Sequence, residues 1–248
     1  MHTASPFPIA APKHEDELIK PALEGTTAVL KACHQNKVKR LVITSSIAAI
    51  MVNDKEGVYT VDDWSDLAKC QPYEKSKTVA ERAAWDFQKK FKEEHDLEIV
   101  TINPGLVMGP NLNKAQFSSG DIVKRVMMND LPGMPKVQMP SVDVRDVAKA
   151  HLNAILIPEA ANQRFILCSE SCWFKDYGQW LDEVYGKQGS KKYKVVNKEL
   201  PKLLCTIVAF FDKELATIMP FWGKEKSFET TTTKEILKID FIPIRKSI

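Results

Sequence analysis

Tyr73 and Lys77 stand four residues apart in the stretch PYEKSKTVAERAAW. Positions i and i+4 share one face of a helix, so both side chains are expected to project in the same direction. A free phenol has a pKa of about 10, which is too high for efficient proton exchange at neutral pH. An ammonium group within about 4–6 Å favours the phenolate and lowers that pKa by about 1–3. Such a pair can exchange a proton with a carbonyl oxygen while hydride reaches the carbonyl carbon.

Chance is the alternative explanation of this spacing. The chain has five tyrosines and many lysines, so a solvent-exposed helix can produce one Tyr-x-x-x-Lys by accident. The surrounding sequence favours chemistry. Thr44, Ser45 and Ser46 end a buried apolar run, and Pro104 and Gly105 end the next one. Ligands of parallel α/β sheets bind at the carboxyl ends of the strands, where a hydroxyl can stabilise negative charge on a substrate oxygen.

Periodicity predicts the elements that position these residues. The expected order is helix, strand, helix and strand, over residues 15–36, 38–50, 72–94 and 97–110. Strands joined by long helical crossovers pair in parallel, so the fold class is α/β. Further elements are expected in the second half: a helix at 119–129, a strand running into a helix at 141–156, a strand at 164–169, a helix at 173–186, a strand at 192–196 and a helical tail.

Bulk composition limits the classes of function. The chain has 248 residues, of which 44% are hydrophobic and 27% charged, as in ordinary globular proteins. A net charge of +3, with lysines scattered beside glutamates, is too small to imply a nucleic-acid partner, so none is expected. No segment reaches the roughly 18–20 apolar residues that a membrane span needs, and LLCTIVAFF (203–211) is interpreted as a buried helix. The N-terminus lacks the features of a signal peptide, and five cysteines without a C-x-x-C spacing fit reduced thiols, so a cytoplasmic location is expected.

Several stretches, in this order, make the chain similar to a known family, the short-chain dehydrogenase/reductases: HTASPFP, PALEGTTAVLKAC, RLVITSSIAAI, YEKSKTVAERAAWDF, INPGLVMGP and VDVRDVAKAHLNAI. The resemblance covers essentially the whole chain. It is to the extended branch that includes dihydroflavonol reductases and cinnamoyl-CoA reductases. It implies a Rossmann-type doubly wound parallel sheet and NADP(H)-linked reduction of an aldehyde or ketone, or oxidation of the alcohol.

The resemblance also implies residue roles. Ser46 would polarise the substrate, Tyr73 would donate the proton, and Lys77 would lower the pKa of the phenol and hold the nicotinamide ribose. The implied cofactor-binding residues are Thr3, Ala4, Ser5, Pro6, Thr44, Ser45, Tyr73, Lys77, Pro104, Gly105, Leu106, Val107 and Ser119. An ordinary turn at residues 2–6 and an ordinary helix cap at Ser119 are the structural alternatives.

The resemblance also implies two domains, each made of two segments of the chain. Residues 1–110, joined by 141–169, are expected to form a partial dinucleotide-binding domain, and residues 111–140 and 170–248 a small substrate-binding lobe. Within that lobe, several apolar side chains could line a pocket or simply fill a core: Met127, Met128, Met134, Trp173 and Phe174.

One family feature is missing. The chain has ten glycines but no G-x-x-G-x-x-G turn, which binds the pyrophosphate at a helix N-terminus. By the resemblance, the first three strands and two helices are absent, so the sheet is incomplete and NAD stays an alternative to NADP(H). A preceding segment could be absent from this sequence, a partner chain or second copy could cover the exposed sheet edge, or the chain could be an inactive relative that serves as a scaffold.

The missing turn predicts weak cofactor binding. These 248 residues alone are expected to bind NADPH far less tightly than a complete relative, because they lack the helix N-terminus that holds the pyrophosphate. Titration of nicotinamide fluorescence measures this affinity. Tight binding would show that the pyrophosphate is held in another way.

Overall fold

The computed structural model describes residues 1–5, 12–112, 118–187 and 189–248. These residues form two compact units, each with its own three-stranded sheet. Unit 1 contains Met1–Gly105, Arg145–Cys168 and Ser227–Phe241. Unit 2 contains Leu106–Val144, Ser169–Lys226 and Ile242–Ile248.

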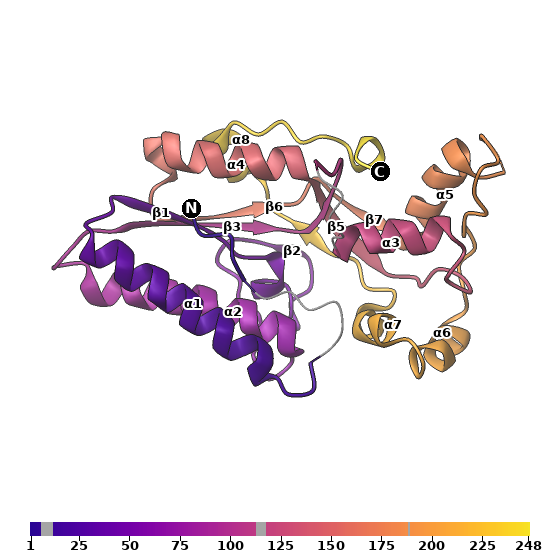
Figure 1. Cartoon of the computed structure of the whole chain (residues 1–248), viewed down its shortest axis with the longest axis horizontal. Helices are drawn as coiled ribbons and strands as arrows, with labels where there is room; N and C mark the ends of the chain where they lie inside the picture. The colour runs from indigo at the N-terminus through magenta and orange to yellow at the C-terminus, as the bar shows by residue number, and fades with distance from the viewer. Residues whose placement is uncertain (6–11, 113–117, 188) are drawn as a thin grey trace. The chain divides into compact units, whose positions relative to one another are not determined.

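The sheet of unit 1 is parallel throughout, in the order β1-β3-β6. Its strands are β1 (Arg40–Thr44), β3 (Glu98–Pro104) and β6 (Gln163–Leu167). Helices cover both faces in Figure 1, with α1 and α2 on one side and α4 and α8 on the other. Strands that are buried on both faces need nearly continuous apolar sequence, which is why the run at 41–43 could be recognised. The predicted parallel α/β arrangement is confirmed.

Two long helices carry most of the packing on one face of this sheet. They are α1 (Asp16–Gln35) and α2 (Pro72–Phe91), close to the predicted 15–36 and 72–94. Pro72 starts α2 because its fixed φ suits the first helical turn, where its missing N–H costs nothing. The helices and strands share one apolar cluster, which contains Leu30, Leu41, Ala84 and Ile99.

The other face is covered by α4 (Val144–Leu156) and α8 (Thr231–Leu237). A two-stranded parallel sheet, β2 (Val58–Tyr59) with β8 (Ser227–Phe228), completes the regular structure of unit 1 together with short 3₁₀ helices. Among those, η1 (Ile47–Ala49) follows β1 and η2 (Pro158–Ala160) precedes β6.

The predicted strand over 97–110 divides into two. β3 ends at Pro104, and Gly105 donates its backbone N–H to the carbonyl of Leu167 at 2.9 Å. The chain then enters β4 (Leu106–Met108), which belongs to the sheet of unit 2. Apolar sequence continues across the break, so the pattern of hydrophobicity could not reveal it.

Unit 2 has a mixed sheet, with β4 parallel to β5 (Gln138–Asp143) and β5 antiparallel to β7 (Glu170–Trp173). Helices α3 (Ser118–Met127) and α5 (Phe174–Tyr185) share an apolar cluster with Met134. The strand predicted at 192–196 is wrong. That segment has no regular structure, because Val196 donates its N–H to the carbonyl of Val126 and pairs with no strand.

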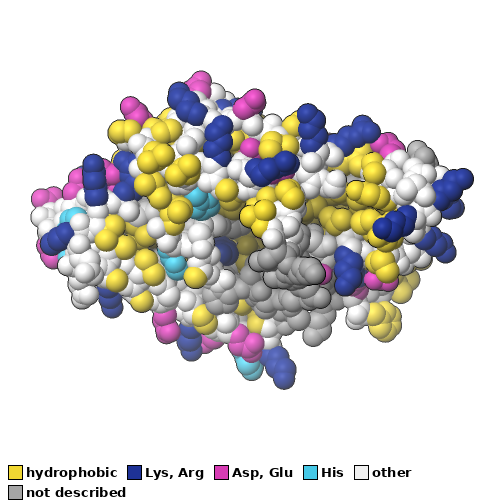
Figure 2. Space-filling view, turned by 45° about the horizontal axis from the view of Figure 1, so that its top comes forward, with side chains coloured by type: hydrophobic (Ala, Val, Ile, Leu, Met, Phe, Trp, Pro, Cys, Tyr) yellow, Lys and Arg dark blue, Asp and Glu magenta, His cyan; other side chains and the backbone are white. Residues whose placement is uncertain are grey.

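The tail of unit 2 forms α6 (Lys202–Ala209), α7 (Lys213–Ile218), η3 (Met219–Phe221) and, near the C-terminus, η4 (Ile244–Lys246). The interpretation of residues 203–211 as a buried helix is wrong, because a short helix that is apolar all round can bury only one side. Cys205 is enclosed, whereas Leu203 is 73% and Phe211 89% exposed. No helix within the described ranges is both long and apolar enough to cross a bilayer. Charged side chains of both signs are interspersed on the face shown in Figure 2.

Candidate active site

Tyr73 and Lys77 lie in the first turns of α2, in unit 1. The Nζ atom of Lys77 is 5.8 Å from the centroid of the Tyr73 ring. Both side chains are half-buried. The helix therefore places the ammonium beside the phenol ring, as the four-residue spacing predicted.

Ser46 meets this pair from the sheet. It directly follows β1 and Ser45, and it caps η1, with its Oγ accepting a hydrogen bond from the backbone N–H of Ala48 at 3.1 Å. A side-chain hydrogen bond also joins Ser46 to the Tyr73 phenol. The structure thus brings the serine, tyrosine and lysine side chains together at the carboxyl end of β1.

Burial controls the protonation of both α2 residues. Dehydration raises the pKa of Tyr73 to about 12, although the hydrogen bond to Ser46 acts in the opposite direction. Dehydration also lowers the pKa of Lys77 to about 8. Removal of water from the phenolate is the largest cause of this raised pKa. That the ammonium of Lys77 lowers the pKa of the phenol stays a prediction. At neutral pH Tyr73 carries its proton, which is the state that a proton donor needs.

The hydroxyls of Thr44 and Ser45 are engaged inside the protein. Thr44 Oγ1 lies 2.6 Å from Nε2 of His151 on α4. The other ring nitrogen of His151 lies 2.8 Å from the carbonyl of Val147, so Nε2 accepts the threonine hydrogen. Ser45 Oγ donates to Glu81 at 2.5 Å. Neither hydroxyl is directed to an open site, and any cofactor contact from these residues would have to come from other atoms.

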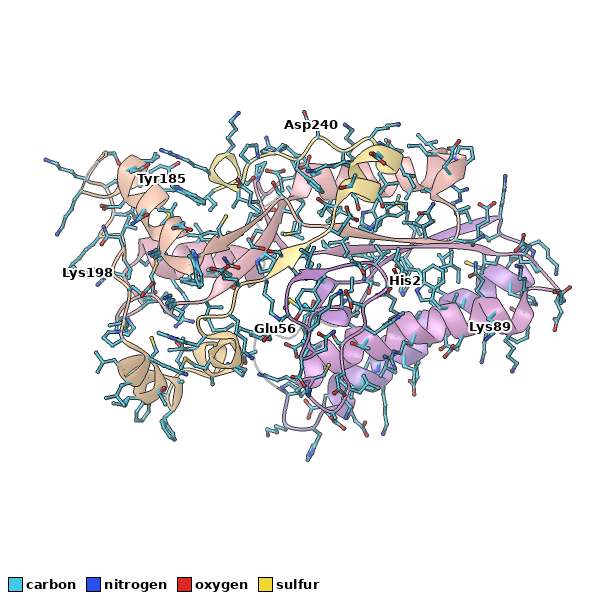
Figure 3. All side chains as sticks on the ribbon, turned by 180° about the vertical axis from the view of Figure 1, so that it is seen from behind. His2, Glu56, Lys89, Tyr185, Lys198 and Asp240 are labelled. Carbon is cyan, nitrogen blue, oxygen red and sulfur yellow. The ribbon has the colours of Figure 1, made fainter. Side chains whose placement is uncertain are left out.

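The N-terminal residues run beside the outer edge of β1. His2 donates its N–H to the carbonyl of Val42 at 2.8 Å and accepts from the N–H of Thr44 at 2.9 Å. Figure 3 shows His2 next to the strands of unit 1. Residues Thr3, Ala4 and Ser5 continue past the end of β1, where the cofactor-binding loop was predicted. Pro6 lies outside the described residues.

His2 also lies near Lys77. Burial lowers the pKa of its imidazole, and the charge of Lys77 lowers it further. A neutral imidazole beside the ammonium avoids repulsion between two cations.

The remaining predicted cofactor residues divide between the units. Pro104 and Gly105 lie in unit 1, at the carboxyl end of β3. Leu106, Val107 and Ser119 lie in unit 2, where Ser119 Oγ donates to the carbonyl of Val107 at 2.6 Å. Binding of a cofactor by any of these residues stays a prediction.

The apolar side chains suggested for a substrate pocket have different environments. Met134 and Phe174 are buried in the core of unit 2, whereas Met128 is 55% exposed. Met127 and Trp173 are partly buried. Across the described ranges, no cluster of three or more His, Cys, Asp and Glu side chains could hold a metal ion.

Sequence reasoning missed a buried polar network beneath the site. Its centre is Glu81, which is 2% exposed and pairs with Arg164 at 2.7 Å. Asn103 is fully buried in β3 and donates to the same carboxylate at 2.7 Å. Two features of the sequence could have revealed it: Glu81 follows Lys77 on the same helical face, and the apolar run IVTINP contains Thr101 and Asn103.

Ser46→Ala is expected to lower carbonyl-dependent turnover by about 10²-fold, because the hydroxyl that is predicted to polarise the substrate would be lost. Thr44→Val is the matched control, since the Thr44 hydroxyl bonds His151 instead. The kcat of both variants, measured at saturating NADPH, tests the difference. Equal losses in the two variants would contradict the role of Ser46.

Comparison with known proteins identifies the family. The model of the 3-beta hydroxysteroid dehydrogenase/isomerase family matches residues 1–177. The chain belongs to this family. The chain is also similar to curated reductases. Anthocyanidin reductase ((2S)-flavan-3-ol-forming) of Vitis vinifera is 34% identical over 203 residues, which are 74% of this chain and 59% of that protein. The chain thus spans about 59% of the length of that curated relative.

Two further matches extend over almost the whole chain. A putative NADPH-dependent methylglyoxal reductase, GRP2 of Candida albicans, is 32% identical and covers 100% of this chain and 72% of its own. The crystal structure of yeast methylglyoxal/isovaleraldehyde reductase Gre2 complexed with NADPH has a TM-score of 0.79 and 26% identity, covering 99% of this chain and 72% of that one. The resemblance to the extended short-chain reductases and the Rossmann-type fold are both confirmed.

Proposed function

We propose that the chain is the catalytic part of an NADP(H)-dependent oxidoreductase that reduces an aldehyde or ketone, or oxidises the alcohol. One observation carries the proposal: the Ser46 hydroxyl, the Tyr73 phenol and the Lys77 ammonium meet at the carboxyl end of a parallel sheet. A carbonyl oxygen placed there would find two hydroxyl donors and a nearby positive charge.

The hydrogen-bond donors at the carboxyl edge of the sheet could also bind a nicotinamide cofactor. The Lys77 ammonium is half-buried and can donate to the hydroxyl groups of a ribose. When bound, a reduced nicotinamide supplies the hydride. The relatives that are named for NADPH or crystallised with it favour NADP(H) over NAD.

The chain's own residues would supply the proton that the carbonyl oxygen receives. Ser46 Oγ would donate a hydrogen bond to the carbonyl oxygen and stabilise the negative charge that develops on it. Tyr73, which holds its proton at neutral pH, would deliver that proton to the oxygen. Lys77, with a pKa of about 8, would still be mostly charged at pH 7 and would stabilise the phenolate that remains.

The substrate class follows from the relatives and the site. Methylglyoxal and isovaleraldehyde, which appear in the names of relatives, are small carbonyl compounds, and we propose a small or aromatic aldehyde or ketone here. We place its binding in the predicted substrate-binding lobe, residues 111–140 and 170–248. A partner chain or second copy that covers the outer edge of β1 belongs to the same proposal, because β1 pairs there only with His2 among the described residues.

Absorbance of the reduced nicotinamide tests this function. The purified protein, given saturating NADPH, is expected to consume it only when methylglyoxal or isovaleraldehyde is added. Failure with both aldehydes, at NADPH concentrations where binding is demonstrated, would contradict the proposal and favour the scaffold alternative.

A further inference from the structure

Glu81 lies on the same face of α2 as the proposed catalytic pair, four residues after Lys77 and eight after Tyr73. Its side chain is enclosed, with 2% exposed surface. A buried carboxylate is tolerated only when donors satisfy both of its oxygens. The identity of those donors shows what Glu81 holds in place.

The donors come from every strand of the sheet in unit 1. Arg164 of β6 donates from Nε at 2.7 Å and Thr101 of β3 from Oγ1 at 3.1 Å, both to Oε1. On Oε2, the hydroxyl of Ser45, just after β1, donates at 2.5 Å and the amide of Asn103 at 2.7 Å. One carboxylate therefore fastens α2 to β1, β3 and β6.

Asn103 extends this link to the backbone of Ser46. Its side-chain amide has two hydrogens, of which one goes to Glu81 and the other to the carbonyl of Ser46 at 3.1 Å. Ser45 and Ser46 are consecutive, so Glu81 fixes the first through its hydroxyl and the second through Asn103. The same carboxylate thus holds Ser45 and Ser46, the serine segment, at a set distance from the helix that carries Tyr73.

Arg164 is held in turn by the loop that follows β2. Its guanidinium lies 3.9 Å from the centroid of the Trp64 ring and donates from Nη1 to the carbonyls of Val61 and Asp63. These contacts leave Glu81 little freedom to shift, which is what an anchor for a catalytic group requires.

We propose that Glu81 is a positioning residue, which sets the separation of the Ser46 hydroxyl from Tyr73 by bonding α2 to the ends of β1 and β3. The inference rests on the proposed function for its effect on turnover, but the geometry it describes can be tested without turnover. Small errors in such separations reduce rates strongly, because reacting groups must approach at near contact distance.

Glu81→Gln tests the proposal with almost no change in size. A glutamine replaces one acceptor oxygen with an NH₂ donor, which would then face the donors that Glu81 now satisfies. Glu98→Gln is the matched control, because Glu98 pairs with Arg40 at 2.6 Å at the opposite ends of β1 and β3. Both variants lose an Arg–Glu pair in unit 1, and only the first touches the serine segment.

Amide hydrogen exchange provides the readout that needs no activity. The N–H groups of Ala48 and Ala49 bond the Oγ and carbonyl oxygen of Ser46. Glu81→Gln is expected to accelerate their exchange at least tenfold, whereas Glu98→Gln leaves it unchanged. Unchanged protection of both amides in a folded Glu81→Gln variant would overturn the proposal, whether or not the protein is a reductase.

Kinetics with methylglyoxal and saturating NADPH provides the second readout. Glu81→Gln is expected to lower kcat about 10- to 100-fold with KM for NADPH within about twofold, and Glu98→Gln to leave kcat unchanged. If Glu81→Gln does not fold, Asn103→Ala replaces it, because that variant keeps the Glu81–Arg164 pair and removes the bonds of the Asn103 amide to Glu81 and to the carbonyl of Ser46. Wild-type kcat in the folded variant would overturn the positioning role, while an inactive wild type would overturn the proposed function alone.

Discussion

Tyr73→Phe is expected to reduce carbonyl-dependent kcat by about 10²–10⁴-fold while NADPH binding changes little. Phenylalanine keeps the ring beside Lys77 and removes only the hydroxyl that carries the transferable proton. Burial raises the pKa of this phenol to about 12, so the wild-type group is protonated across the neutral range. Stopped-flow traces of nicotinamide absorbance, together with a fluorescence titration of NADPH, separate the chemical step from binding.

Tyr59→Phe serves as the control for this experiment. Tyr59 is buried in the same unit, and its hydroxyl donates to the carbonyl of Lys55, at 3.3 Å. Loss of that hydroxyl is expected to leave kcat within about twofold, since it takes no part in the site. Full activity in Tyr73→Phe would rule out the phenol as proton donor.

Lys77→Met is expected to make the protein more stable and less active. Burial lowers the pKa of Lys77 from 10.5 to about 8, so the unfolded chain binds this proton more readily than the folded chain does. Stability therefore rises with pH between about 8 and 10.5, and below pH 8 the full cost of the buried ammonium is present. Methionine removes that cost, which is about 1–3 kcal/mol after allowance for a half-buried side chain.

The same substitution should lower kcat by about 10²-fold, because the phenolate formed during reduction would lose its neighbouring charge. Urea unfolding at pH 7 and pH 9.5 measures the stability, and Lys75→Met, which removes an exposed ion pair with Glu15, is the control. We expect Lys75→Met to change neither kcat nor the pH dependence. A Lys77→Met protein with wild-type kcat, or with unaltered pH dependence of unfolding, would contradict this assignment.

The helical spacing of Tyr73 and Lys77 and the polar residues after a buried strand were enough to predict that these groups lie together. Both features follow from local rules. Helix periodicity places Tyr73 and Lys77 on one face, and strand direction in a parallel sheet places the polar residues at its carboxyl edge. The direction of the Tyr73 pKa was beyond these rules. It depends on how much water the folded chain removes from the phenol, and that is a property of tertiary packing.

The Glu81 network was missed for a similar reason. A glutamate on a helix rich in charged residues normally faces solvent, and only the fold shows that Arg164, 83 positions later, lies against it. The break between β3 and β4 at Gly105 was not predicted, because the apolar sequence continues while the chain passes from one sheet to the other. The strand predicted at 192–196 was wrong because Val196 donates its N–H to the carbonyl of Val126 in α3 instead of pairing with a strand.

The most direct test of the central claim follows the hydrogen atom itself. NADPH that carries deuterium on the transferable position of the nicotinamide is mixed with methylglyoxal and the purified protein, and the product is analysed by mass spectrometry. We predict an alcohol with deuterium on its former carbonyl carbon, formed by the wild type and by Tyr59→Phe, and at a rate at least 10²-fold lower by Tyr73→Phe. Deuterated product formed as fast without the Tyr73 hydroxyl, or absent from all three reactions, would contradict the account.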